Sequence, residues 1–138
     1  MKKLLLCAFI ALSTLTSCSN DETETTNVDN SFSRQIVEVK GYDKDGVYQS
    51  TGYDKAVTEN SKIIYNEIDK TIKVTVSSEQ VYNIVSTTEN VYYSTTKIAG
   101  TTPELILNVK IYIQNGNIIF EVTKADNTFL AKLEYIVK

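Results

Sequence analysis

Residues 105–124 read LILNVKIYIQNGNIIFEVTK, two alternating runs joined by Asn115 and Gly116. Asn-Gly between alternating apolar segments is the strongest short-range signal of a two-residue β-hairpin, because both residues adopt positive φ at little cost. Antiparallel strands of this kind turn one face to a core and the other to water. In the first run the apolar face is Leu105, Leu107, Val109, Ile111 and Ile113, and the polar face is Asn108, Lys110, Tyr112 and Gln114. The hairpin predicts an all-β, antiparallel fold.

The same period-two pattern extends to both sides of this hairpin. Downstream, residues 118–123 alternate, and a last strand is predicted over residues 129–137. Upstream, turns and loops separate runs rich in Val, Ile, Thr and Tyr, which favour strands. These runs are residues 35–42, 47–55, 63–68, 72–77, 81–88 and 91–98. In the first run Val37 and Val39 fall on one face. We therefore expect about eight to nine strands in a single β domain.

Tight turns make strands that are neighbours in sequence neighbours in the sheet. A meander that buries one face of every strand needs closure or a second layer. We therefore expect an up-and-down barrel, with a two-sheet sandwich as the alternative. Such a barrel is similar in architecture to a lipocalin. The chain contains no Trp and so lacks the Gly-x-Trp motif of that family, which makes the likeness one of architecture alone.

The N-terminal segment is of a different kind. Residues 1–3 (MKK) are cationic, residues 4–12 are apolar but too few to span a bilayer, and residues 15–18 read LTSC. This tetrapeptide resembles the lipobox of bacterial lipoproteins: a branched apolar residue, two small residues and a cysteine. The resemblance implies cleavage between Ser17 and Cys18 and acylation of Cys18. Several acyl chains on one cysteine give durable membrane attachment, since one chain binds only marginally.

The segment after Cys18 is polar and acidic. Residues 19–22 (SNDE) resemble the acidic signal that sends lipoproteins of Bacteroidetes-type bacteria to the outer face of the outer membrane, and a solvated acidic linker is the alternative. Residues 19–31 hold one apolar side chain, Val28, and should be disordered. The predicted location is the outer membrane of a Gram-negative bacterium, at the cell surface or the periplasmic face. The predicted organisation is a signal peptide (1–17), a lipidated cysteine with a tether (18–31) and a β domain (32–138).

Charge argues against nucleic acid as a partner. Removing residues 1–17 takes Lys+Arg from 14 to 12 and leaves Asp+Glu at 17. Four of these acids lie in the tether, so the β domain carries 12 basic and 13 acidic groups, a net charge of −1. Nucleic-acid binding requires a clustered basic face. Membrane contact is expected from acylated Cys18 rather than from a polybasic patch.

The side chains that carry most enzyme chemistry are missing. The chain has no His, and its two cysteines are Cys7 in the signal peptide and Cys18. Ser-His-Asp triads, Cys-His pairs and imidazole-ligated metals are therefore excluded. We find no cofactor motif, and we expect no cofactor, no metal and no enzyme. A hydrolase built on two carboxylates stays open. Residues 43–46 (DKDG) place their glycine too early for a calcium loop and predict a hairpin turn.

Binding is the remaining class of function, in two forms. In the first, the domain is an interaction module for an envelope protein, with a filled interior and an outward patch of Tyr or apolar residues. The chain has nine Tyr, although β-propensity also explains them. In the second, the barrel carries a small apolar ligand. The candidate ligand-facing residues are Leu107, Val109, Phe120, Val122 and Leu133.

Overall fold

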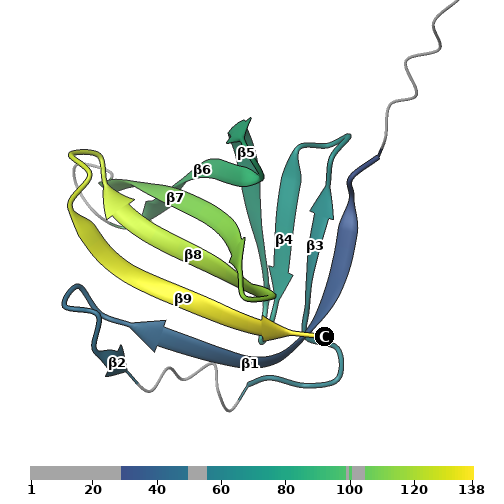
Figure 1. Ribbon diagram of the computed structural model, residues 1–138. Helices are drawn as coiled ribbons and strands as arrows, with labels where there is room; N and C mark the ends of the chain where they lie inside the picture. The colour runs from purple at the N-terminus through teal and green to yellow at the C-terminus, as the bar shows by residue number, and fades with distance from the viewer. Residues whose placement is uncertain (1–28, 50–55, 99, 101–104) are drawn as a thin grey trace, which may run out of the picture.

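A computed structural model describes residues 29–49, 56–98, 100 and 105–138. Regular structure in these segments is entirely β-strand, and none of them forms an apolar helix of membrane-spanning length. The strands, labelled in Figure 1, are β1 (Phe32–Tyr42), β2 (Tyr48–Gln49), β3 (Lys62–Asn66), β4 (Thr71–Thr75), β5 (Glu79–Thr88), β6 (Val91–Ile98), β7 (Leu105–Gln114), β8 (Asn117–Lys124) and β9 (Phe129–Val137). Each predicted run contains a strand. Of the run predicted over residues 47–55, residues 50–55 lie outside the described residues.

The strands form one antiparallel sheet that closes on itself. Its order is β2-β1-β3-β4-β5-β6-β7-β8-β9, and β1 also pairs with β9. Eight strands therefore make a closed barrel, and β2 is an extra strand at the end of β1, where Tyr42 pairs with Tyr48. Figure 1 shows β9 lying along β1 where the ring closes. The predicted all-β class and the up-and-down barrel are confirmed.

Two strands, β1 and β5, form the corners of the barrel. The first part of β1 pairs with β3 and the remainder with β9. In the same way, β5 pairs first with β4 and then with β6. Each of these strands has a register shift close to its change of partner, at Val37 in β1 and at Val85 in β5. Bulges bend a strand and increase its twist, which lets a strand pass from one sheet into another at an angle.

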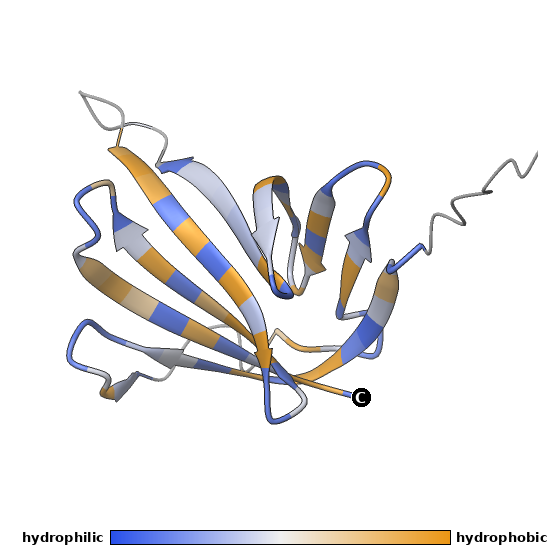
Figure 2. Cartoon of the chain, turned by 45° about the horizontal axis from the view of Figure 1, so that its top comes forward, coloured by the Kyte–Doolittle hydropathy of each residue, from blue (hydrophilic) through white to orange (hydrophobic). Residues whose placement is uncertain are grey.

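The hydrophobic core fills the interior of the barrel. Figure 2 shows apolar and polar residues alternating as orange and blue bands along the strands, as expected for walls with one buried face. β5 contributes the half-buried Tyr82 and Ile84 to this core. The buried cluster consists of Ile36, Val39, Ile63, Tyr65, Ile72, Val74, Tyr92, Val109, Ile111, Ile118, Phe120 and Tyr135.

The bulge in β1 overturns one predicted face. Simple alternation places Val37 and Val39 together, but Val39 is fully buried whereas Val37 is 43% exposed. The register shift against β9 puts Ile36 in the core in place of Val37, because one extra residue flips every side chain before it. Leu105 and Ile113, predicted on the apolar face of β7, are exposed at the two ends of that strand.

The turns follow the local sequence signals closely. Asn115 and Gly116 have φ of 52° and 81°, as a type I′ hairpin turn requires. Glu89 and Asn90 form a second two-residue turn, with φ of 49° and 65°. The strand predicted over residues 63–68 ends early at Asn66, so that Ile68 lies in the turn between β3 and β4.

Candidate functional site

The five interior candidates lie together on β7, β8 and β9. Val109 pairs with Val122, and Phe120 pairs with Leu133, so these side chains share one face of the sheet. Leu107, Val109 and Phe120 are buried, and Val122 and Leu133 are half-buried. All five therefore belong to the inner wall of the barrel, as the alternation in the sequence predicts.

Aromatic rings occupy the space in front of this inner wall. The ring of Phe120 lies 5.1 Å from that of Tyr82 and 5.1 Å from that of Tyr135, both edge-on. A second chain of rings joins Tyr65 to Phe32 at 5.6 Å and to Tyr92 at 4.6 Å. A small, partly open void holds about 10 Å³ and is lined by Val74, Val76, Ser78, Gln80 and Tyr135. That volume is about the size of one water molecule, and none of the five candidates lines it.

The outer wall over β7, β8, β9 and the end of β1 carries an ordered group of polar side chains. Residues paired across an antiparallel sheet lie side by side on the same face. At its centre is Ile119, which faces outward but is only 2% exposed. We call this group the outer-wall cluster; it consists of Tyr42, Lys110, Tyr112, Asn117, Ile119, Glu121, Lys132 and Glu134.

Hydrogen bonds from tyrosine hydroxyls organise the outer-wall cluster. Tyr112 donates to Glu121 Oε1 at 2.6 Å, and Tyr42 donates to Glu134 Oε2 at 3.1 Å. The second oxygen of Glu134 accepts a hydrogen bond from Asn117 Nδ2 at 2.8 Å. Each carboxylate thus has a tyrosine partner on the adjacent strand, β7 for Glu121 and β1 for Glu134.

Two lysines complete the cluster by lying over the tyrosine rings. The Nζ of Lys110 is 5.0 Å from the ring centroid of Tyr112, and that of Lys132 is 4.2 Å from the ring centroid of Tyr42, distances typical of cation–π contacts. Burial, together with the hydrogen bond to Glu121, raises the pKa of Tyr112 to about 12. Burial also raises the pKa of Tyr42. Both hydroxyls therefore remain protonated donors at neutral pH.

Glu121 and Glu134 bring two carboxylates onto adjacent strands, as a carboxylate hydrolase would need. Glu121 pairs with Lys132, and Glu134 lies two residues further along β9. Both carboxylates already accept hydrogen bonds from tyrosines and stand on an outer wall. Neither lines the small void beside Tyr135, nor an open depression beside the start of β1 and the end of β3. Among the residues that the structure describes, no three His, Cys, Asp or Glu side chains gather as a metal site would require.

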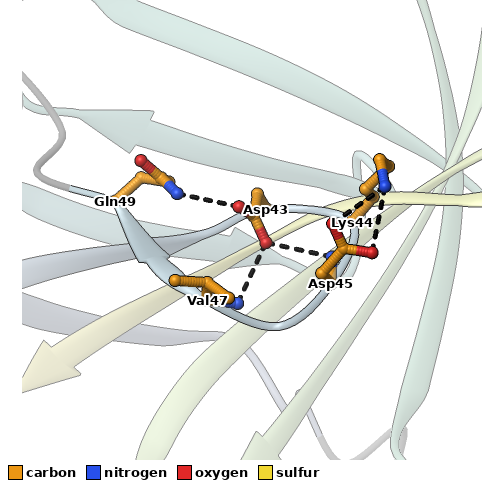
Figure 3. A network of polar contacts seen from close by, with 5 residues as sticks. All are labelled: Asp43, Lys44, Asp45, Val47 and Gln49. Atoms are coloured by element: carbon orange, nitrogen blue, oxygen red, sulfur yellow. Dashed lines mark hydrogen bonds and ion pairs between the residues drawn. The ribbon is translucent and has the colours of Figure 1, made fainter.

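The turn after β1 is a hairpin turn, as its sequence predicts. Asp43 Oδ1 accepts hydrogen bonds from the backbone N–H groups of Asp45 and Val47, each at 2.9 Å, and Oδ2 accepts one from Gln49 Nε2 at 2.7 Å (Figure 3). The backbone hydrogen bond from Val47 is the largest of several effects that lower the pKa of Asp43. The carboxylate of Asp43 therefore stabilises its own turn by accepting hydrogen bonds within it.

Comparisons with known proteins give this chain no relatives. No protein-family model matches it, and the searches of curated proteins and of solved structures found no match. No family or homologue therefore indicates catalysis in this barrel. Ser17 and Cys18, the predicted processing and lipidation sites, lie outside the described residues.

The outer-wall cluster is a feature that the sequence analysis missed, although a signal for it exists. A two-residue turn at Asn115 and Gly116 fixes the register of β7 against β8. That register places Lys110 opposite Glu121 and sets Tyr112 two residues away on the same face. The contribution of Tyr42 could not be found in this way, because it depends on the closure of the barrel between β1 and β9.

Proposed function

We propose that this chain is a lipid-anchored protein of the bacterial envelope whose barrel is a binding module. In this proposal acylated Cys18 holds the protein on the outer membrane of a Gram-negative cell, and the barrel contacts a protein partner through the outer-wall cluster. The lipobox-like residues 15–18 support the anchor. The observation that carries the binding role is the cluster itself, an outward face on which Tyr112 and Tyr42 are held by hydrogen bonds.

Preorganised tyrosines suit a protein interface. Tyrosine is enriched at interfaces because it has a large apolar body and a polar tip. Side chains that are already held in place lose less conformational entropy when a partner binds. Beside the cluster, Tyr48 is 50% exposed and stacks edge-on against Tyr42, with ring centroids 6.0 Å apart. This ring extends the ordered surface with an accessible aromatic side chain.

The alternative, a carrier of a small apolar ligand, needs room inside the barrel. Drug-sized ligands occupy pockets of about 300 Å³ or more. The void beside Tyr135 holds only about 10 Å³. The five candidate residues line neither this void nor the larger open depression at the start of β1. A ligand between Phe120 and Leu133 would have to displace the rings of Tyr82 and Tyr135 from Phe120. The packing of the interior therefore favours recognition by the outer wall.

Replacement of the lipid carrier tests the anchor. We expect Cys18→Ser to move the protein from the membrane fraction to the soluble fraction, because no acyl chain could then be attached. Cys7→Ser is the matched control, since that cysteine would leave with the signal peptide. The anchor is refuted if the Cys18→Ser protein stays in the membrane pellet at high salt.

Site-specific crosslinking in intact cells tests the binding role. A photo-crosslinking amino acid in place of Tyr48, beside the outer-wall cluster, is expected to give a discrete protein adduct. The matched control replaces Val81 on β5, which is similarly exposed at 49% but lies where β5 pairs with β4. Adducts of the same kind at both positions, or at neither, would contradict binding through the cluster. Native mass spectrometry of the same protein would detect a bound small molecule, which would favour the carrier instead.

A further inference from the structure

The barrel has an open depression at the point where the chain enters it. The depression holds about 370 Å³ and lies beside the start of β1 and the end of β3. The residues that line it include the apolar Phe32, Tyr65, Ile64 and Ile68. The complete set of lining residues is Asp29, Ser31, Phe32, Ser33, Ile64, Tyr65, Asn66 and Ile68.

The rim of this depression carries a large apolar side chain that is not buried in the hydrophobic core. Ile68 is 82% exposed, the highest value among the exposed large hydrophobic residues of the described chain. It lies in the turn between β3 and β4, where Gly, Asn, Asp or Ser would be usual. A single exposed Ile is ordinary on a protein surface, but this one lines the same depression as Phe32 and Ile64.

Hydrogen bonds hold the entering chain against this same turn. The backbone N–H of Asn30 donates to Glu67 Oε2 at 2.6 Å. The backbone N–H of Glu67 donates to Ser31 Oγ at 2.9 Å. Residues 30 and 31 are therefore tied to the residue next to Ile68. In Figure 1 the start of β1 lies beside the β3–β4 turn, and β2 lies at the other end of β1.

The distance from this entry point to the lipid is bounded by the chain itself. Ten residues, 19–28, separate Cys18 from Asp29, and a fully extended chain of ten residues spans at most about 35 Å. If Cys18 carries the lipid, as proposed above, the end of the barrel with Ile68 is held within about 35 Å of the membrane. Tyr42 stands at the opposite end of the eleven-residue strand β1 from Phe32.

We propose that Ile68, together with Phe32 and Ile64, contacts lipid and holds this end of the barrel against the membrane that carries Cys18. We call this contact the seating of the barrel. Apolar side chains of interfacial elements enter the boundary between headgroups and acyl chains. The flanking charges are of both signs, with Glu67 in a 3.9 Å ion pair with Lys70. Apolar contact rather than charge attraction would therefore hold the barrel end on the lipid. Seating would turn the outer-wall cluster at Tyr42 away from the lipid, toward a partner.

The test uses the lipidated full chain in vesicles of phosphatidylethanolamine and phosphatidylglycerol. In the proposed mature protein Cys18 is consumed by the lipid, so Ile68→Cys introduces a single thiol for an environment-sensitive fluorophore. Val47→Cys is the matched control: it is an apolar turn residue, 55% exposed, at the other end of β1. We expect the label at Ile68→Cys to shift to shorter wavelength and to lose most of its fluorescence when spin-labelled lipids are included. The label at Val47→Cys should keep both its wavelength and its intensity.

Each of the other possible outcomes contradicts either the seating alone or the seating together with the anchor. Equal quenching at the two positions, or none at either, in a chain that sediments with the vesicles overturns the seating and leaves the anchor intact. A wavelength shift at Ile68→Cys without quenching by spin-labelled lipid means that protein covers the depression, which also overturns the seating. A chain that does not sediment with vesicles, and in which Cys18 reacts with thiol reagents, overturns the anchor and the seating together. Circular dichroism checks that both variants are folded.

Discussion

Replacing Phe120 with alanine should remove the centre of the barrel packing. Phe120 is 1% exposed, and its ring meets those of Tyr82 and Tyr135 at 5.1 Å each. Large-to-small substitution of a buried Phe costs about 3–5 kcal/mol, and the cost rises when the surroundings cannot collapse into the cavity. A closed barrel resists such collapse, because its wall strands are tied to one another all the way round. We therefore expect a value at the upper end of this range.

Two further variants separate the contributions to the expected loss of stability. Phe120→Leu keeps apolar bulk but loses both aromatic contacts, each worth about 0.5–1.5 kcal/mol, so we expect a loss of about 1–3 kcal/mol. Ile113→Ala removes a side chain of β7 that is 55% exposed, and should change stability by no more than about 0.5 kcal/mol. The ratio of the three losses thus reports how completely the interior is filled around Phe120.

The assay is urea unfolding of the unlipidated Cys18→Ser chain without its signal peptide, followed by tyrosine fluorescence and circular dichroism. With a denaturant slope of about 2 kcal/mol/M, Phe120→Ala should lower the unfolding midpoint by about 2 M. Since small domains are stable by only about 5–15 kcal/mol, this is a large share of the total. If Phe120→Ala costs no more than Ile113→Ala, the interior is not packed around this ring, and the carrier function regains support.

Three further predictions concern turns and ionisation. Changing Glu89 to Asn and Asn90 to Gly should raise the melting temperature, because both positions have positive φ and Asn-Gly adopts this turn at lower steric cost; a lower melting temperature would contradict the turn geometry. Tyr112 is neutral in both the folded and the unfolded state below about pH 10, and its pKa in the folded state is about 12. The free energy of unfolding should therefore fall as pH rises between these values. Urea titrations should show a shallower fall for Tyr112→Phe. Asp43→Ala should speed amide hydrogen exchange at Val47, which loses its acceptor, and unchanged exchange would rule out this role of the carboxylate.

The nine strands and most of the turns could be predicted because their signals are local. Alternation has a period of two residues, and Asn115-Gly116 is read from two neighbours in sequence. The errors arise where pairing with another strand intervenes. Val37 is exposed because a bulge against β9 shifts the register of β1, and Ile68 lies in a turn because β3 pairs with β4 only as far as Asn66. Such shifts depend on partners outside the segment concerned.

The sequence by itself determined the class of the fold, the approximate position of most strands, the inner-wall identity of Leu107, Val109 and Phe120, and the absence of imidazole and free-thiol chemistry from the domain. These properties follow from the residue types and from short-range periodicity. Only the tertiary structure decided that β1 closes the ring with β9, that aromatic rings fill the interior, and that Tyr42 joins Tyr112 on one outer wall. The physical reason is distance along the chain: Tyr42 and Glu134 are 92 residues apart, and no local pattern encodes a contact made by closure.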